Sequence, residues 1–507
     1  MQPNDMLIEM RGITKHFGSV VANENVNLTV RRGEILSVLG ENGSGKTSLM
    51  NMLAGIYFPD AGHIYMNGRE VVIRSPKDAF ALGIGMIHQH FKLVEVLTAA
   101  ENIILGLPGP LKLDMKKVTK EIRELADKYG FELDPDRKIY EMSVSQKQTV
   151  EIVKMLYRGA NVLILDEPTA VLTPQETEKL FQVLRNMRAQ GHSILIITHK
   201  LNEVLSLSDR VAVLRKGESI GTVDTKDATE RSLTEMMVGK KVDLDIERPD
   251  PVDPIMKLKL TNVNAVDHEG RPVLSNVEFE AYTGEILGIA GIAGSGQKEL
   301  LTSGRIQYRN RKGHIKELTE MSAQEIREIG IRLAFVPEDR LGMGLVSSMG
   351  MTDNMMLRSY RHGHSFFSER RQPRELAETI MKELEVVTPS VEWPVGRMSG
   401  GNVQKVLVGR EISSSPQVLM VAYPVRGLDI NSSYTIYHLL NEQKKKGSAV
   451  ICVGEDLDVL LALCDRILVL ADGKISGIVD ARTATKEDVG LLMTNHGYRG
   501  ADKEAEA

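Results

Sequence analysis

The stretch GENGSGKT, Gly40 to Thr47, decides the fold of this chain. It follows the apolar, strand-like run EILSVL and precedes SLMNMLAG, which has the pattern of a helix. Strand, glycine loop and helix in that order are the context in which the spacing G-x-x-x-x-G-K-[ST] forms a phosphate-binding loop, or P-loop. Its glycines let backbone N–H groups face a phosphate, and the helix N-terminus adds positive charge. The sequence therefore predicts an α/β domain that binds a nucleotide.

The residues of this loop have expected roles. Lys46 is predicted to reach the β- and γ-phosphates of ATP, and the Thr47 hydroxyl is predicted to bind Mg²⁺. A glycine turn that binds nothing is the alternative, and the flanking strand and helix argue against it. The predicted nucleotide-binding set is Gly40, Glu41, Asn42, Gly43, Ser44, Gly45, Lys46, Thr47 and Ser48.

A second element, NVLILDEP, supports the P-loop. It runs from Asn161 to Pro168 and reads as a buried strand that ends in two carboxylates, where a P-loop protein holds its metal. Asp166 is predicted to orient Mg²⁺ through its water shell. Glu167 is predicted to activate the attacking water as a general base, a role worth roughly 10²–10⁴-fold in rate.

The chain repeats itself once. RRGEILSVLGENGSGKTSL, from Arg31 to Leu49, returns as YTGEILGIAGIAGSGQKEL, from Tyr282 to Leu300, and SLSDRVAVLRKG returns as ALCDRILVLADG. The two copies start about 250 residues apart, and a repeating unit of that length with its own glycine loop is a domain. The predicted division is a first domain at 1–242, a linker at 243–256 that is rich in proline, a second domain at 257–497 and a polar tail at 498–507.

Short Val/Ile/Leu runs alternate with helical patterns such as Thr177 to Ala189 in each copy. This alternation is typical of an α/β sheet with parallel strands. The early segment from Leu7 to Val30 instead has the pattern of antiparallel strands, and a helical insertion is expected as well. We therefore expect a mixed sheet in each domain.

Composition excludes several classes of protein. The chain has 507 residues, of which 42% are hydrophobic and 26% charged, as in soluble globular proteins. No run approaches the roughly 20 apolar residues of a membrane span, and the N-terminus does not resemble a secretory signal, so we expect a cytoplasmic protein. A net charge of −5 argues against a nucleic-acid surface, and the basic run Lys444 to Lys446 is expected to be a solvated helix end. The two cysteines, Cys452 and Cys464, are expected to be buried thiols.

The motifs together resemble the ATP-binding cassette (ABC) family over nearly the whole chain. Within it, the chain looks like the tandem ATPase subunits of bacterial sugar and nucleoside importers. The stretches that carry the closer resemblance are MIHQHFKLVEVLTAAENIILG (Met86 to Gly106), PTAVLTPQE (Pro168 to Glu176), VPEDRLGMGLV (Val336 to Val346) and MSGGN (Met398 to Asn402). The resemblance implies an α/β fold class of two P-loop NTPase cassettes in tandem. Each would have a RecA-like parallel-sheet core, an antiparallel β subdomain and a helical subdomain.

The resemblance also implies roles for three further residues. Gln89 would be the glutamine that senses the γ-phosphate and the metal, and His199 would be the histidine that contacts the γ-phosphate. Phe17 would stack on adenine. Each has an alternative from the residues alone, since a phenylalanine is more often in the core and a histidine at a strand end is often structural.

The second copy departs from the family pattern at several positions. Its P-loop reads GIAGSGQK, with Gln297 in place of the lysine and Lys298 in place of the metal-binding hydroxyl. An amide cannot supply the lysine's charge, and a lysine cannot ligate a cation. At the equivalent positions of the repeat, Asp166 is replaced by Ala422 and Glu167 by Tyr423. The histidine is replaced by Glu455 and the glutamine by Glu338. Hydrolysis is not expected in this copy.

The signature segments are unequal in the opposite sense. The second copy keeps the SGG of the family signature as Ser399, Gly400 and Gly401, before a predicted helix. The first copy reads MSVSQ, with Val144 and Ser145 in place of the glycines, and their side chains are expected to crowd the approach. Cassettes of this family pair head to tail, so the resemblance implies one working site, in which Ser399 to Gly401 face the first P-loop, and one degenerate site.

The importer resemblance implies partners as well. We expect two transmembrane permease subunits, an extracytoplasmic solute-binding protein acting through them, and peripheral attachment at the cytoplasmic face of the cell membrane. The segment HQHFKLV favours a nucleoside over a sugar as solute, by resemblance alone. A tandem ABC ATPase acting on the ribosome is the alternative, which the short linker and the damaged second site disfavour. No nucleic acid is expected as a partner.

Overall fold

The computed structural model describes residues 6–18, 20–88, 91–107, 114–170, 172–240, 246–266, 270–291, 295, 297, 305–309, 314–319, 321–359 and 369–494. The chain divides into two compact units, Met1–Asp243 and Leu244–Ala507. This division falls at the start of the segment expected to be a linker.

A six-stranded sheet forms the centre of the first unit, in the order β10-β9-β3-β8-β7-β6. Its strands are β3 (Ile35–Leu39), β6 (Ile84–Ile87), β7 (Val162–Asp166), β8 (Ser193–Thr198), β9 (Arg210–Arg215) and β10 (Glu218–Asp224). All pairs are parallel except the edge pair β9–β10. Every residue of β3 is buried, as expected for a parallel strand covered on both faces. The P-loop therefore starts from the middle of the sheet.

A separate four-stranded antiparallel sheet contains the N-terminal segment, as the sequence predicts. Its order is β2-β1-β4-β5, with β1 (Met6–Phe17), β2 (Val20–Arg31), β4 (Ala61–Met66) and β5 (Arg69–Val71). Ile8, Met10 and Ile13 of β1 are buried in a core that also holds residues of the central sheet and of α1 (Lys46–Leu53). This packing anchors the P-loop helix between the two sheets.

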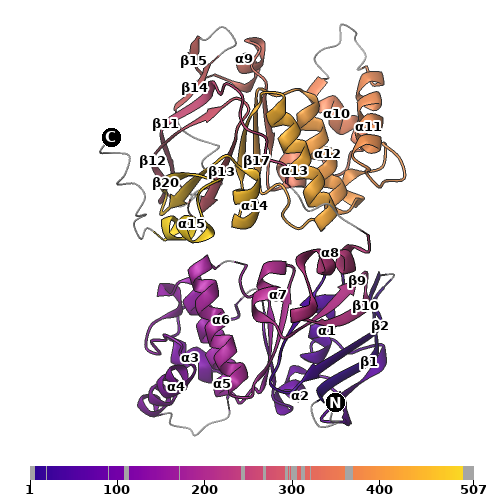
Figure 1. Ribbon diagram of the computed structural model, residues 1–507, viewed down its shortest axis with the longest axis vertical. Coiled ribbons are helices and arrows are strands. Elements are labelled where there is room, and N and C mark those ends of the chain that lie inside the picture. The colour runs from indigo at the N-terminus through magenta and orange to yellow at the C-terminus, as the bar shows by residue number, and fades with distance from the viewer. Residues whose placement is uncertain are drawn as a thin grey trace. The chain divides into compact units, whose positions relative to one another are not determined.

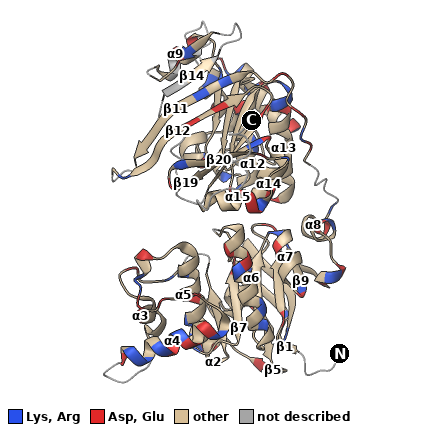
Figure 2. Ribbon diagram, turned by 60° about the vertical axis from the view of Figure 1, so that its left-hand side comes forward, with Lys and Arg blue, Asp and Glu red and all other residues tan. Residues whose placement is uncertain are grey.

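Helices complete the first unit. They are α1, α2 (Pro76–Ala81), α3 (Ala99–Ile104), α4 (Met115–Tyr129), α5 (Val144–Tyr157), α6 (Pro174–Ala189), α7 (Leu201–Leu207) and α8 (Glu230–Val238). Within this unit, α3, α4 and α5 lie together, away from the antiparallel sheet, and these three helices form the helical subdomain (Figure 1). Helix α4 is rich in charged residues of both signs (Figure 2), while Ile122, Ala126 and Tyr129 are buried. The strong amphipathic pattern of this helix explains its docking.

The second unit repeats both sheets. Its central sheet has the order β16-β17-β18-β13-β19-β20, and its antiparallel sheet has the order β12-β11-β14-β15. The central strands are β13 (Ile286–Gly291), β16 (Leu333–Val336), β17 (Val418–Ala422), β18 (Ala449–Val453), β19 (Arg466–Ala471) and β20 (Lys474–Asp480). The others are β11 (Met256–Val266), β12 (Pro272–Tyr282), β14 (Arg305–Arg309) and β15 (Ile315–Glu317).

The helices of the second unit also follow the first. They are α9 (Ala323–Glu328), α10 (Met351–Ser359), α11 (Arg371–Glu383), α12 (Gly400–Ser413), α13 (Ile430–Lys445), α14 (Leu457–Leu463) and α15 (Lys486–Met493), with a π-helical turn at Arg340–Gly344. Two cassettes in tandem, each with a parallel core, an antiparallel subdomain and a helical subdomain, are thereby confirmed as the fold class. The segments 498–507 and residue Lys298 lie outside the described residues.

The described part of the expected linker packs against the second unit. Ile246 contacts its hydrophobic core, and the Glu247 carbonyl accepts a hydrogen bond from Asn441 Nδ2 at 2.5 Å. Arg248 donates to the carbonyls of Leu461 and Cys464 at 2.7 and 2.8 Å, at the C-terminal end of α14. This segment is therefore structurally part of the second cassette from residue 246 onward.

The basic run at the end of α13 corrects one sequence expectation. Lys445 and Lys446 are exposed, but Lys444 is only 2% exposed, and its Nζ lies 2.7 Å from Asp465 Oδ1. The helix turns this one position inward, where Asp465 also accepts from the Ile286 N–H. A buried pair of this kind cannot be seen in a run of like charges.

Both cysteines are buried, as predicted. Burial raises the pKa of the Cys452 thiol to about 12 and raises that of Cys464 as well, so neither has the character of a reactive thiolate. Among the described helices, none combines the length and the apolar character that crossing a bilayer requires.

Candidate active site

Lys46 lies buried inside the P-loop of the first unit. Its Nζ donates to the backbone carbonyls of Gly40 at 2.7 Å and Glu41 at 2.9 Å. Burial lowers its pKa, and the charges of Glu167, Asp166 and Glu41 oppose that shift. The loop therefore wraps around its own lysine and holds a positive charge where a phosphate would be bound.

Two glycines of the loop lie where neighbouring protein atoms leave no space for a Cβ. A Cβ on Gly45 would lie 2.4 Å from the Ala22 carbonyl oxygen, and Gly45 itself has φ +94°, which favours glycine. A Cβ on Gly40 would lie 2.5 Å from Ser44 Oγ. That hydroxyl is buried and has no hydrogen-bond partner among the described residues. An orphaned donor and a cradle of bare backbone at a helix N-terminus fit a bound phosphate.

Asp166 ends β7 beside the P-loop helix. Burial and the neighbouring charge of Glu167 raise its pKa to about 6, while Lys46 and a hydrogen bond from Thr47 act in the opposite direction. Of the three residues predicted to hold Mg²⁺, Thr47 and Asp166 are thus already in contact, and Gln89 lies outside the described residues. The described residues contain no cluster of three or more His, Cys, Asp or Glu side chains that could bind a metal unaided. This fits Mg²⁺, which is commonly held by one or two protein groups together with phosphate oxygens.

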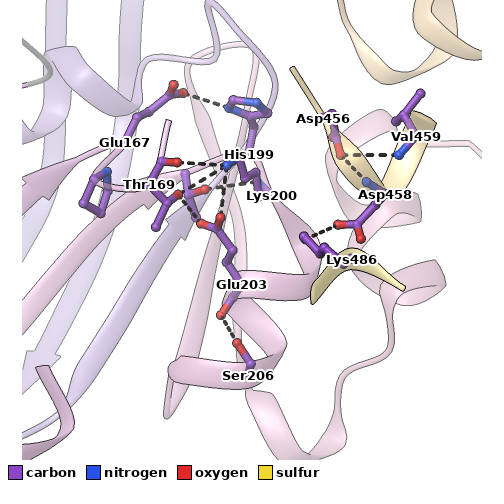
Figure 3. Close-up of polar contacts among 12 residues, drawn as sticks. Glu167, Thr169, His199, Lys200, Glu203, Ser206, Asp456, Asp458, Val459 and Lys486 are labelled. Atoms are coloured by element: carbon purple, nitrogen blue, oxygen red, sulfur yellow. Dashed lines mark hydrogen bonds and ion pairs between the residues drawn. The ribbon is translucent and has the colours of Figure 1, made fainter. Parts of the chain in front are cut away.

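Glu167 and His199 form a pair at the ends of adjacent strands. Glu167 Oε1 lies 2.8 Å from His199 Nδ1 (Figure 3). Burial alone would raise the pKa of Glu167, but the hydrogen bond and charge of His199, with the charges of Lys46 and Lys200, outweigh burial and lower it. A carboxylate that stays ionised can accept a proton from water, which is what a general base must do.

The backbone of Glu167 is unusual. Its φ is +47°, in the left-handed region that a residue with a side chain rarely adopts. The turn is held by hydrogen bonds from the Glu167 N–H to the Ile197 carbonyl at 2.9 Å and from Gln148 Nε2 to the Pro168 carbonyl at 2.8 Å. Strained residues of this kind concentrate at functional sites.

The remaining predicted residues have different outcomes. Phe17 ends β1 with 41% of its surface exposed and packs edge-on against Tyr57, with ring centroids 5.0 Å apart. It is therefore a surface aromatic and not a core residue, which suits a stacking platform. Ser48 lies in the first turn of α1. Gln89 lies outside the described residues, just beyond β6.

The second unit keeps the backbone of this site without its chemistry. Tyr423 has φ +48°, and its N–H donates to the Val453 carbonyl at 2.8 Å, as Glu167 does in the first unit. Arg426 contacts the side chains of Glu338 and Glu455, which stand where the first copy has Gln89 and His199. No carboxylate follows β17, since that strand ends in Ala422 and is followed by Tyr423.

The two signature segments each form the N-terminus of a helix, and they differ in the groups that they expose there. Ser399 caps α12, and its neighbour Gly400 is exposed. In the first unit, Ser143 caps α5, and its Oγ lies 3.1 Å from Ser145 Oγ. Val144 is 43% exposed beside it. The second unit thus presents bare backbone at this helix start, and the first presents side chains.

Three residues of the site were not found from the sequence. Thr169, Lys200 and Glu203 contact one another beside Glu167 and His199. A signal was available, because aligning the two copies shows that all three change in the second one, to Val425, Asp456 and Val459.

Comparison with known proteins agrees with this geometry. A family model described as ABC transporter matches residues 23–170 and again residues 274–424. The nucleoside import ATP-binding protein NupA of Lactococcus lactis subsp. cremoris is 40% identical over 505 residues, covering 97% of this chain and 98% of the relative. The guanosine import ATP-binding protein NupO of Bacillus subtilis is 39% identical and covers 98% and 99%. The glucose import ATP-binding protein TsgD13 of Haloferax volcanii is 39% identical and covers 97% and 96%.

These matches span both cassettes, and in the first unit the structure places Glu167 against His199 and Asp166 beside the P-loop helix. The chain belongs to the ABC transporter family and is an ATPase that carries two of the family's cassettes in tandem.

Proposed function

We propose that this chain hydrolyses ATP at the first P-loop only, and that this hydrolysis drives import of a nucleoside, or of a sugar, through two membrane permease subunits. An extracytoplasmic solute-binding protein would deliver the solute, and the chain would be held at the cytoplasmic face of the membrane by the permeases. The observation that carries the proposal is the Glu167–His199 pair beside Lys46, set against Tyr423 and Glu455 in the second copy.

Each residue of the first site has a proposed task. Lys46 and the backbone of Gly40 to Gly45 bind the phosphates, and Phe17 packs against the base. Glu167 accepts the proton of the attacking water, and His199 orients Glu167 and contacts the γ-phosphate. Thr47 and Asp166 hold Mg²⁺, with Gln89 as a further contact, and Mg²⁺ would neutralise charge on the phosphate oxygens.

The signature residues Ser399, Gly400 and Gly401 are proposed to contact the γ-phosphate of ATP bound to the first P-loop. Support comes from the capped start of α12 and from the exposed backbone of Gly400. Their pairing with that P-loop stays a prediction.

The solute is proposed from the relatives. Two of the three named above are import proteins for nucleosides, by their names, and one is for glucose. An uptake assay with a labelled nucleoside, in competition with unlabelled nucleosides and hexoses, separates the two classes. Inhibition by hexoses alone would overturn the nucleoside proposal.

Hydrolysis by the full chain assembled with its permeases tests the catalytic part. Glu167→Gln should lower turnover by roughly 10²-fold or more, because it removes the base while keeping the shape of the side chain. Tyr423→Phe, at the equivalent place in the second copy, should leave turnover near that of the wild type. Comparable losses from both variants would overturn the assignment of one hydrolytic site.

A further inference from the structure

Thr169, Lys200 and Glu203 form a connected cluster, the turn clamp, next to the Glu167–His199 pair (Figure 3). Lys200 Nζ donates to the Thr169 carbonyl at 3.2 Å and lies 3.1 Å from Glu203 Oε1. The Thr169 hydroxyl donates to Glu203 Oε2 at 2.6 Å. The cluster thus joins the turn after β7 to the start of α7 through both side chains and backbone.

The turn clamp is partly shielded from solvent. Thr169 is 2% exposed, and the side chains of Lys200 and Glu203 are 34% and 16% exposed. A charged pair that is partly buried and also bonded to backbone and hydroxyl groups is better defined in geometry than a pair on the open surface.

The clamp is local to the catalytic residues. Thr169 follows Glu167 by two positions, and Lys200 directly follows His199. Any shift of the clamp therefore moves the backbone that carries the base, the backbone that carries the histidine, or both.

Lys200 is an unfavourable residue for the start of helix α7. It is the N-cap residue of α7 and makes no side-chain capping bond, and its positive charge stands at the positive end of the helix. In the second copy the same position is Asp456, whose carboxylate accepts from the N–H groups of Asp458 and Val459. A residue that is poor for its own helix is expected where function requires it.

The second copy also shows that the clamp is not needed to build the turn. Val425, Asp456 and Val459 replace the three clamp residues, so the clamp cannot form there. Yet Tyr423 has φ +48° against +47° for Glu167, and both make the same strand-to-turn hydrogen bond. The fold of the turn is therefore independent of the clamp, and what changes with the clamp is the presence of a catalytic carboxylate.

We infer that the turn clamp positions Glu167 against His199 for hydrolysis, with Lys200 as its central positioning residue. This inference rests on the proposed assignment of Glu167 as the base. It assigns Lys200 a role through Glu167 and not on the nucleotide.

Lys200 also acts on Glu167 through its charge. The groups that face this carboxylate are His199, Lys46, Lys200 and Asp166, from the end of β8, from α1, from the start of α7 and from β7. The three bases favour the ionised form of Glu167.

Steady-state hydrolysis of ATP by the full chain in the same assembly tests the inference. Lys200→Met should lower kcat about tenfold or more, because small displacements of a catalytic group cost up to about 10²-fold. KM for ATP should change by less than about twofold, because the phosphate-binding residues are untouched. Lys200→Arg should recover most of the lost kcat, because it keeps a positive charge and a hydrogen-bond donor at this position.

The second copy offers a matched control. Lys486→Met removes an ion pair with Asp458, at 2.7 Å, beside the position equivalent to Lys200 (Figure 3), and should leave kcat unchanged. Thr169→Val reproduces the second copy at one clamp position and should lower kcat in the direction of Lys200→Met.

The outcomes separate the inference from the proposed function. If Glu167→Gln abolishes hydrolysis but Lys200→Met behaves as the wild type, the clamp inference fails alone. If Glu167→Gln retains turnover, the proposed function fails. A Lys200→Met chain that loses its secondary structure by circular dichroism would make the clamp a folding element and would also overturn the inference.

Discussion

Glu167 and Tyr423 are the residues at which the two cassettes differ most in chemistry and least in backbone. Both have left-handed φ angles, near +47° and +48°, and both donate an N–H to the neighbouring strand. A left-handed conformation costs a residue with a side chain roughly 1–2 kcal/mol. In the first copy this cost places a carboxylate beside His199, whereas in the second it places a tyrosine beside Arg426.

Asp166 gives a prediction at the same scale. Its pKa is raised to about 6 from an ordinary value near 3.8, so its charged form is disfavoured in the folded, metal-free protein. The folded state binds a proton more tightly than the unfolded state, and stability falls as pH rises from about 4 through 6. Asp166→Asn should therefore stabilise the metal-free chain, by about 1–2 kcal/mol at pH 7.5 after allowing for solvent screening, and by less at pH 5.

Thermal unfolding of the metal-free protein at the two pH values measures this effect. The same variant should lose hydrolysis, because it removes the carboxylate proposed to hold Mg²⁺. An equal change in Tm at pH 5 and pH 7.5 would contradict the origin assigned to the raised pKa.

Single residues were predictable where a motif fixes them and not where a distant partner does. Lys46 and Asp166 were predicted from the P-loop and from the end of an apolar strand, because such motifs carry their own short-range geometry, and His199 was predicted from the family resemblance. Lys444 and Lys200 could not be interpreted in that way. Their burial and their contacts depend on Asp465 and Thr169, which tertiary packing brings to them.

At the scale of elements, α5 and α12 occupy equivalent places in the two units, but one side-chain hydrogen bond of α5 has no counterpart on α12. Gln148 on α5 donates to the Pro168 carbonyl, and Gln404 occupies the equivalent position on α12. Gln404 is 1% exposed, and neither polar atom of its side chain has a partner among the described residues. Burying an unsatisfied amide costs about 1–3 kcal/mol.

Leucine at the two positions should therefore have opposite effects. Gln404→Leu should stabilise the second unit by about 1 kcal/mol, because an unpaired amide is replaced by an apolar group of similar size. Gln148→Leu should destabilise the first unit by about 1–2 kcal/mol, because it leaves the Pro168 carbonyl without its donor. Urea unfolding of the full chain, followed by hydrogen exchange in each unit, checks both, and destabilisation by Gln404→Leu would contradict the unpaired state of that amide.

Elements near the motifs were predictable and those set by packing were not. The strand before the P-loop and the strand that ends at Asp166 were both expected, because apolar runs of strand length between turn signals are a strong local pattern. The π-helical turn at Arg340–Gly344 has no such pattern. It is a local adjustment that the surrounding contacts impose.

At the scale of the whole molecule, the linker is unequally shared between the units. Arg248 closes the C-terminal end of α14 by donating to two carbonyls there, so the linker supplies part of that helix's terminal hydrogen bonding. The sequence indicated an extended, proline-rich segment, and this is as much as composition can tell. Its attachment to one unit depends on contacts with helices some 200 residues further along the chain.

Arg248→Met should loosen that attachment. We expect it to destabilise the second unit by about 1–3 kcal/mol and to speed amide exchange in α14, because two helix-terminal carbonyls lose a charged donor. Lys445→Met removes an exposed contact with Glu247 in the same segment and should change stability by less than about 0.5 kcal/mol. Equal exchange in α14 for Arg248→Met and wild type would contradict the role of the linker.

The left-handed turn at Tyr423 has a consequence for the evolutionary origin of the second cassette. A turn that costs conformational energy has no evident reason to arise at a tyrosine, yet it shares its φ angle and its hydrogen bond to the neighbouring strand with the turn at Glu167. The buried Gln404 likewise occupies the place of a residue that has a partner in the other copy. Both read as inheritance from a duplicated ancestor whose second cassette was once catalytic, and whose active-site side chains were replaced before its backbone had changed.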